Sequence, residues 1–500
     1  MVNHSLFADF SKQSPKGILV IYAKLLFKAF KATWILLIIF IQRFSKFSEE
    51  TLVYVYIGII VFLVFFLIRA YLVYTNFLFK IDDGQFVLKE GILQKKNTSI
   101  SFDRIQNINF KQNLIQQLIN VYEVSIETAG SKDTEIAIKA LTFEKAQALK
   151  MALSLVKKKK QQLELEEKQP KPLLKIGFKE LFKVSLTENH LQNLLVFMAL
   201  VFGALQQLND VFIGIGEKDV LGNYVDVNPK DIFNSIIIFV IFILILIVIG
   251  VLSSLVRILL FHFNLTLFIK DKSFEITQGL LTKKSIILSK GKIQSITIST
   301  NPIKKKLGIS FVTFKQAVSG KVKKQQNKLI RIIGCKIEQI KTIKELLYVD
   351  DSVDDETRYV PNNYYKLRMY FRSTIGIVIL NSVIFFLIKD ATWLWVNMLV
   401  VPVILLLIHL RYRKAFYQFN KELLLIGKGR VETHVTYLPF FKVQNIKIKQ
   451  TIFQKRRKVV NLVLQTASGK ITLPCIEENR AITLYNYILY KVESSKESWM

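Results

Sequence analysis

The sequence is poor in the residues that most often build disulfide, metal or catalytic sites. It has only two cysteines, Cys335 and Cys475, which lie far apart and show neither a disulfide framework nor a zinc-ligand spacing. The five histidines share no metal-ligand spacing, and no Gly-x-Gly segment continues into a phosphate-binding loop. We therefore predict that the protein is not an enzyme and has no catalytic, cofactor-binding or metal-binding residues.

Acidic residues are also scarce. The chain carries 70 Lys and Arg against 38 Asp and Glu, which gives a formal net charge of +32. Such an excess is typical of nucleic-acid-binding proteins, but basic residues also accumulate on the cytoplasmic side of membrane proteins. Because no strand shows an obvious face of aromatic residues for stacking bases, we predict that nucleic acid is not a partner.

Five long stretches contain no charged residue, and each approaches the roughly 17–25 residues that a helix needs to cross a bilayer. These stretches are Thr51–Ile68, Leu191–Asn209, Ile232–Val256, Ser373–Ile388 and Ala391–Leu410. A sixth, Ala32–Gln42, is long enough only if it includes Lys24, Lys28 and Lys31, whose side chains can reach back to the interface. The alternative for this sixth stretch is a buried core helix. We predict six transmembrane helices in three hairpins.

The distribution of charge predicts how these helices are oriented. Basic residues crowd the N-terminus and the regions that follow each hairpin, whereas the connections inside the hairpins have few of them. Since Lys and Arg favour the cytoplasmic side, we expect a multi-pass protein of the cell membrane with its soluble regions in the cytoplasm.

One pattern occurs three times in those soluble regions. A glycine is followed fifteen residues later by a glutamine that sits in a short basic and apolar tetrad. The pairs are Gly91 and Gln106, Gly279 and Gln294, and Gly429 and Gln444. Fixed offsets that recur at three places indicate one folded unit used three times.

Each repeat predicts a small β-rich module. In the first repeat, apolar and polar residues alternate over Phe77–Ile81, Gln85–Lys89, Ile105–Phe110, Val121–Glu127 and Glu135–Lys139. An apolar helical period from Phe143 to Val156 follows. Several antiparallel strands closed by one C-terminal helix make a small sandwich or barrel, so the fold class is membrane α + β.

The predicted organisation alternates membrane and soluble regions. We assign 1–70 to a basic N-terminus and hairpin 1, 71–160 to module 1, 161–190 to a linker and an amphipathic stretch, 191–261 to hairpin 2, 262–348 to module 2, 349–372 to an acidic linker, 373–410 to hairpin 3, and 411–500 to module 3.

Helix pairs that feed modules with this repeated glycine–glutamine motif resemble the bacterial pleckstrin-homology-like (PH-like) membrane proteins of the YdbS/YdbT type. The three-copy, six-helix layout resembles the YdbT arrangement over nearly the whole chain. The resemblance implies a PH-like fold, in which two packed antiparallel sheets are closed by a C-terminal helix. It implies no catalytic activity.

Basic residues near the motifs are the candidate contacts with lipid head groups or protein partners. They are Lys95, Lys96, Arg104, Lys283, Lys284, Lys304, Lys305, Lys306, Lys455, Arg456, Arg457 and Lys458. A Lys or Arg close to an anionic leaflet contributes about 1 kcal/mol of attraction. The alternative is that these charges only enforce topology and solubility.

Three further segments carry smaller predictions. The amphipathic stretch Leu173–Glu188 is expected to lie on the membrane surface. The linker Val349–Arg358 has five carboxylates that could hold a divalent cation, although a solvated linker is the commoner arrangement. Asn381 and Asn397, in the last hairpin, are expected to bridge neighbouring helices.

The leading functional hypothesis is a non-enzymatic membrane protein whose three modules form a scaffold against the anionic inner leaflet. It would bind lipid head groups or partner proteins, with a homo-oligomer among the possibilities. The alternative is an accessory protein for transport or export of a hydrophobic or amphipathic molecule. The lack of ionisable residues inside the apolar helices disfavours transport of ions or solutes.

Overall fold

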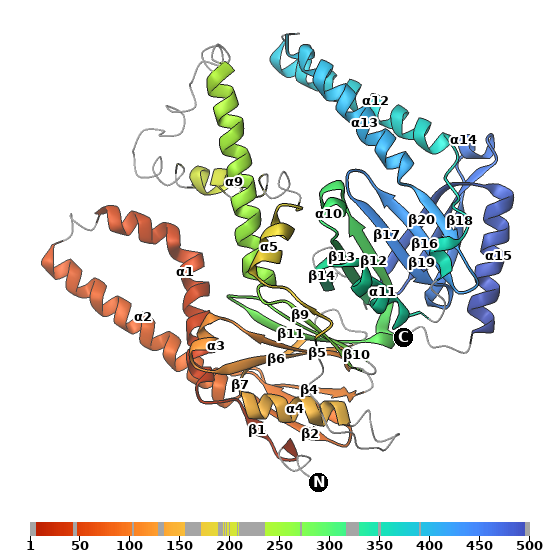
Figure 1. The fold of residues 1–500 in the computed structure, drawn as a ribbon. Helices are drawn as coiled ribbons and strands as arrows, with labels where there is room; N and C mark the ends of the chain where they lie inside the picture. Colours follow the sequence, from red (N-terminus) through yellow and green to blue (C-terminus); the bar gives the residue numbers. More distant parts are fainter. Residues whose placement is uncertain are drawn as a thin grey trace.

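The protein is described here from a computed structural model (Figure 1). The structure describes residues 7–43, 48–102, 105–128, 135–155, 172–188, 236–270, 273–316, 330–348, 352–389 and 392–495, and part of 194–209. Seven of the nineteen residues of the predicted crossing Leu191–Asn209, and residues 161–171 of the linker, lie outside the described residues.

Three modules of the same design follow one another along the chain. Each has six strands in two groups of three and a C-terminal helix. Module 1 contains β2 (Leu78–Asp82), β3 (Gln85–Glu90), β4 (Lys96–Ser101), β5 (Ile105–Gln112), β6 (Val121–Thr128), β7 (Glu135–Thr142) and α4 (Phe143–Leu155). Module 2 contains β9 (Thr266–Lys270), β10 (Ser273–Gln278), β11 (Lys283–Ser289), β12 (Ile293–Thr300), β13 (Ser310–Gln316), β14 (Ile330–Cys335) and α11 (Ile337–Glu345). Module 3 contains β15 (Phe416–Phe419), β16 (Leu423–Gly429), β17 (Thr433–Pro439), β18 (Val443–Lys449), β19 (Val459–Thr466), β20 (Gly469–Glu477) and α15 (Glu478–Ser494).

Each module buries a core because its strands alternate, and the core of module 2 also takes in Leu423, Leu425 and Tyr437 of module 3. In β3, for example, Phe86 and Leu88 are buried while the residues between and after them are more exposed. Module 3 shows the same arrangement, with Ala481, Leu484 and Ile488 of α15 buried against the strands. The predicted strand periods and C-terminal helices are therefore present in all three repeats.

The modules are not separate bodies, because neighbouring modules share a sheet. The second group of strands of module 1 continues into the first group of module 2, in the order β7-β6-β5-β11-β10-β9-β8. Module 2 is joined to module 3 in the same way, in the order β14-β13-β12-β17-β16-β15. At both junctions the pairing is antiparallel, β5 with β11 and β12 with β17. The sequence analysis did not predict this arrangement.

Apolar helices lead into the modules (Figure 1). In the described part of the chain, four helices are long and apolar enough to cross a membrane: α2 (Glu49–Thr75), the part of α9 (Ile236–His262) from Leu244, α12 (Tyr364–Ile388), and the segment Leu394–Arg413, which contains α13 (Asn397–Arg413). The weakest predicted span lies in α1 (Gly17–Arg43), which is not among the four. The layout of six spans in three hairpins therefore stays a prediction.

Two asparagines join the last pair of helices. The side-chain amide of Asn381 in α12 donates to Asn397 at 3.3 Å, and that of Asn397 donates back at 3.0 Å. The predicted bridge is confirmed. It satisfies both amides, which would otherwise be unpaired between apolar helices.

The amphipathic stretch before the third predicted crossing is part of module 2. It forms β8 (Leu174–Lys175), which pairs with β9, and α5 (Phe178–Ser185). Leu181 and Val184 of α5 are buried in the core of module 2. Leu181 and Val184 therefore face the module, whereas Phe178 and Phe182 are exposed, and the position of this stretch on the membrane surface stays a prediction.

The three motif glycines have a structural role. Gly91, Gly279 and Gly429 have φ angles of +115°, +111° and +144°, and each precedes a turn into β4, β11 or β17. A Cβ atom at Gly279 would lie 2.1 Å from the carbonyl oxygen of Thr282, and the other two glycines are as crowded. Only glycine fits this turn without strain.

Replacing Gly279 with alanine should therefore lower the stability of the protein. Backbone strain of this kind costs about 1–3 kcal/mol. The close contact between the new Cβ and the carbonyl of Thr282 adds to that cost. The measurement is thermal unfolding of the purified full-length protein in detergent. The matched control is Gly291→Ala in the same module, where an added Cβ would meet nothing within 4 Å. Equal melting temperatures for the two variants would contradict the assignment.

Candidate functional site

Each module carries a short helix after the first strand of its second group. These helices are α3 (Leu114–Leu118), α10 (Pro302–Lys306) and α14 (Ile452–Lys455). Each begins at a cap residue, Asn113, Asn301 or Thr451, whose side-chain oxygen accepts a hydrogen bond from the backbone three residues on. Because the three caps occupy the same place in the repeat, the three loops have the same local structure.

Apolar side chains on and next to these helices are exposed. They are Leu114, Leu118, Ile303, Leu307, Ile452 and Phe453. The glycine turns add Leu93, which is fully exposed, and Leu280, Leu281 and Val431. Exposed apolar groups at corresponding places in three modules indicate a surface that contacts a membrane or another protein.

Both kinds of loop lie beside the ends of the long helices. The backbone N–H of Leu280 donates to the carbonyl of Leu260 in α9 at 3.1 Å. The guanidinium of Arg457, just after α14, lies 5.1 Å from the ring centroid of Tyr364 at the start of α12. We call these loops, on the side of the modules from which the apolar helices leave, the helix-side loops (Figure 1).

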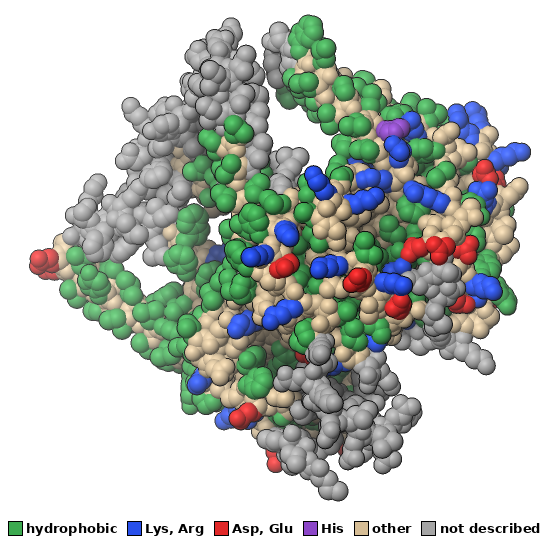
Figure 2. Space-filling model, in the orientation of Figure 1, with side chains coloured by type: hydrophobic (Ala, Val, Ile, Leu, Met, Phe, Trp, Pro, Cys, Tyr) green, Lys and Arg blue, Asp and Glu red, His purple; other side chains and the backbone are tan. Residues whose placement is uncertain are grey.

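Basic side chains accompany the apolar ones. Among the predicted contacts, Lys95, Lys96, Lys283, Lys305, Lys306 and the four residues Lys455–Lys458 are exposed, and Lys284 is half-buried. Figure 2 shows Lys and Arg side chains spread over the modules, with the apolar helices extending away from them. Arg104 lies outside the described residues.

Lys304 differs from its neighbours because it is buried. Its side chain is 2% exposed and its ammonium forms an ion pair with Glu432, in the turn before β17. The same ammonium lies 3.6 Å from the ring centroid of Phe311. Of the three consecutive lysines, this one therefore joins module 2 to module 3 instead of facing solvent.

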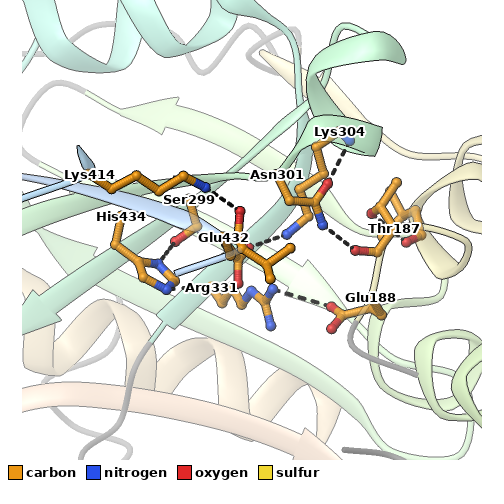
Figure 3. Close-up of polar contacts among 11 residues, drawn as sticks. Thr187, Glu188, Ser299, Asn301, Lys304, Arg331, Lys414, Glu432 and His434 are labelled. Carbon is orange, nitrogen blue, oxygen red and sulfur yellow. Dashed lines mark hydrogen bonds and ion pairs between the residues drawn. The ribbon is translucent and has the colours of Figure 1, made fainter. Parts of the chain in front are cut away.

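Lys304 and Glu432 belong to a polar cluster at the junction of modules 2 and 3 (Figure 3). Across the paired strands, the hydroxyl of Ser299 and Nδ1 of His434 are 2.7 Å apart, and the hydroxyls of Thr297 and Thr436 are 3.0 Å apart. Two more contacts attach the cluster to the segment after α5: the Asn301 amide donates to the Thr187 carbonyl at 2.8 Å, and Arg331 pairs with Glu188 at 3.2 Å.

Burial and charge shift the pKa values in this cluster. Burial lowers the pKa of Lys304, and the contact with Glu432 offsets part of that effect. Burial alone would raise the pKa of Glu432, but the hydrogen bond and charge of Lys304 outweigh it, so the pKa lies below its usual value. Burial also lowers the pKa of His434, against the attraction of Glu432. The pKa shifts of Glu432 and His434 therefore favour an ionised carboxylate beside a neutral imidazole.

In modules 2 and 3 the basic residue of the motif tetrad also reaches the preceding module. The ammonium of Lys292 donates to the carbonyl of Ile105 at 3.0 Å, and that of Lys442 donates to the carbonyl of Gly291 at 2.8 Å. The two lysines are equivalent in the repeat, and the two carbonyls lie two positions apart in it. The tetrad lysines of modules 2 and 3 are thus part of the junctions between modules.

A cavity of about 500 Å³ lies in module 1 where α2 enters it. Its lining combines basic and apolar residues: Lys95, Lys96 and Lys139 with Val73, Phe77 and Ile92, and one carboxylate, Glu90. Burial and the nearby charge of Lys24 lower the pKa of Lys139. Lys95 and Lys96 were among the predicted contact residues, whereas Lys139 was not, because it lies in an ordinary strand pattern.

Sequence comparison then identifies the family. The profile described as "Bacterial PH domain" matches residues 30–157, 220–348 and 376–492. The chain belongs to the bacterial PH domain family. It is also similar to the UPF0699 transmembrane protein YdbT of Bacillus subtilis (strain 168), with 24% identity over 440 residues, which are 84% of this chain and 86% of that protein. The resemblance predicted from the motifs is confirmed, and the protein is a transmembrane protein with three PH modules.

The motif glutamines occupy different environments in the PH modules. Gln294 in β12 is fully buried, whereas Gln444 in β18 is exposed. Gln106 is the second residue of β5. The difference follows from the junctions, because β12 is paired with β17 while β18 forms the edge of its sheet.

The acidic linker joins PH modules 2 and 3. Asp354 accepts hydrogen bonds from the ammonium of Lys344 at 2.6 Å and from the hydroxyl of Tyr437 at 2.8 Å. Among the described residues no group of three His, Cys, Asp or Glu side chains could hold a metal ion. Two of the five carboxylates, Asp350 and Asp351, lie outside that part of the chain.

The ion pair at the second junction should contribute to stability. Glu432→Gln leaves the Lys304 ammonium buried without its carboxylate, and breaking a buried pair costs about 3–5 kcal/mol. Because Glu432 is about one-third exposed, we expect a loss near or below about 3 kcal/mol. Thermal unfolding of the full chain measures it. The double variant Lys304→Met/Glu432→Gln should recover most of the loss, and no recovery would contradict the pairing.

Acid should weaken the same junction through His434. Its folded-state pKa lies below its usual value, so stability is fully present above the unfolded pKa of about 6.5 and is lost as the pH falls below it. The melting temperature of the wild type should therefore drop more between pH 7.5 and 5.5 than that of His434→Gln. Parallel pH profiles for the two proteins would show that His434 does not contribute.

Proposed function

We propose that the protein is a non-enzymatic scaffold of the cell membrane whose three cytoplasmic PH modules bind the head groups of anionic lipids. The observation that supports this proposal is the composition of the helix-side loops. Exposed apolar side chains recur in these loops of all three modules, and exposed lysines or arginines stand next to them in the glycine turns of modules 1 and 2 and in the short-helix loops of modules 2 and 3. That combination suits the boundary between head groups and acyl chains.

The loops are held at the right distance for such contacts. α2 ends at Thr75 and β2 begins at Leu78, while α13 ends at Arg413 and β15 begins at Phe416. Connections this short keep the loops within the Debye length of about 8–10 Å over which an anionic surface attracts basic groups. At about 1 kcal/mol for each residue, the four basic residues Lys455–Lys458 would together give substantial attraction.

The apolar side chains add a second contribution. Ile452 and Phe453 are 75% and 67% exposed, and fully burying a side chain of this size contributes about 1.5–3 kcal/mol. Insertion of these apolar side chains would add to the attraction between the basic side chains and anionic lipids. The attraction makes binding depend on the acidic lipid content of the membrane.

The cavity of module 1 is a candidate site for a single head group. Three lysines against one carboxylate favour an anion, and Val73 and Phe77 provide an apolar wall on the side of α2. A phosphate on a lipid would meet the lysines while its glycerol backbone lies against the helix end. The transport alternative stays a prediction, since no contact among the described helices favours it.

The lipid proposal can be tested with the full chain in lipid nanodiscs. Ile452→Cys provides a labelling site for a polarity-sensitive dye, and both native cysteines are buried. Burial raises the pKa of Cys335 to about 12 and also raises that of Cys475, so neither competes for the dye. We expect the emission to shift to the blue in discs with phosphatidylglycerol relative to phosphatidylcholine alone.

Arg456→Glu/Arg457→Glu should abolish that difference between lipids. The matched control is Lys470→Glu, at the start of β20, where an exposed lysine lies at the other end of the β19–β20 pair. Eight residues of strand separate the two ends by about 25 Å, well beyond the screening distance. An emission that does not depend on the lipid, or an equal effect of Lys470→Glu, would refute charge-dependent contact.

A further inference from the structure

The two internal junctions use the same strand register. At the second junction, Thr297 in β12 is opposite Thr436 in β17, and these residues lie three positions after Gln294 and seven after Gly429. At the first junction, Asn109 in β5 is opposite Ile286 in β11, again three positions after the motif glutamine and seven after the motif glycine. A junction is therefore a reproducible contact between two defined edges: the first strand of one module's second group and the last strand of the next module's first group.

In the described part of the chain, each terminal module leaves one of these edges unpaired. β18 is the outer strand of the sheet β18-β19-β20, and β4 is the outer strand of β1 (Ser11–Lys12)-β2-β3-β4. The exposures agree with this difference. Thr297 in β12 is 7% exposed, whereas its equivalent Lys447 in β18 is exposed, and Ile448 beside it is 41% exposed.

The loops at the two ends match in the same way. At the first junction, the side-chain amide of Gln117 in α3 donates to the carbonyls of Leu280 and Leu281 in the glycine turn of module 2. Lys455 in α14 holds the Gln117 position of module 3 and is exposed, and the glycine turn of module 1 presents Leu93 fully exposed. In the described part of the chain, the short helix of module 3 has no glycine turn of a following module against it. The glycine turn of module 1 has no short helix of a preceding module against it.

We propose that β18 of one copy pairs with β4 of a second copy, in the register of the internal junctions. The second copy is the occupant because the chain itself carries the complementary edge with the spacing that both junctions use. The arrangement places Lys447 opposite Thr98 and Lys449 opposite Lys96. The like charges are no obstacle, since Lys111 is opposite Lys284 at the first junction.

Such a contact joins unlike surfaces, so it can repeat. Each further copy adds three modules to a continuing row, and the row ends only if it closes into a ring. Copies anchored in one membrane by the apolar helices present their modules on the same side, which favours edge-to-edge pairing. This inference does not depend on lipid binding.

Disulfide trapping in native membranes tests the pairing. Two differently tagged full-length copies are co-expressed, one with Thr98→Cys and the other with Lys447→Cys, and then oxidised. Opposite residues in antiparallel strands lie within reach of a disulfide. We expect a cross-linked dimer carrying both tags, in at least severalfold greater yield than with Thr98→Cys and Ile446→Cys, because Ile446 points to the other face.

An intrachain control establishes that the geometry permits trapping. Thr297→Cys/Thr436→Cys in one chain should close a disulfide at the second junction, where the native hydroxyls are 3.0 Å apart. If this control closes while Thr98→Cys and Lys447→Cys give no dimer, the proposal is overturned. Equal yields with Ile446→Cys would mean random collision, and capture of a different protein at Lys447→Cys would mean another partner; either result also overturns it.

Discussion

Backbone pairing between neighbouring modules is the interaction on which the rest of the structure depends. A six-stranded module of this kind has two edges that can take part in junctions, and open edges expose unsatisfied N–H and C=O groups. In this protein four of the six edges that could take part in junctions are used, β5 with β11 and β12 with β17. Three small folds thereby become one continuous body, with sheets that cross from one module core to the next.

This continuity decides where the candidate contact surfaces lie. Because both junctions have the same register, each module is presented to its neighbour in the same way, and its helix-side loops recur at corresponding places. The apolar helices keep these loops on the side of the modules that they enter, since almost no residues lie between helix and module. A joined row of modules can therefore bring several weak contacts to one membrane at once, and linked contacts reinforce one another through effective concentration.

The sequence predicted what depends on local pattern. Alternation gave the strands, a change of period gave α4 and α15, and the glycine offsets marked turns that tolerate no Cβ at Gly279. It could not predict the junctions, because they pair strands that lie far apart in the sequence, and no local pattern shows which strand edge will meet which. Lys304 illustrates the limit: nothing in a run of three lysines shows that Glu432, 128 residues later, buries the first of them. Lys139 was missed for the same reason, since only the fold brings β7 to the end of α2.

One difference between the repeats does carry information about the edges. Strand β12, which is paired on both sides, has Thr297 and Ser299. The edge strand β18 has Lys447 and Lys449 in their place. Lysines on an open edge oppose indiscriminate strand pairing, which protects a protein that must stay soluble beside a membrane. They do not forbid a pairing whose register is fixed by a turn and a short helix, as Lys111 and Lys284 show at the first junction. Covalent connection makes the internal junctions independent of concentration, whereas a junction between copies forms only as the protein becomes dense in its membrane. In the proposed pairing, the same strand edge would therefore act as a permanent joint within the chain and as a density-dependent one at its ends.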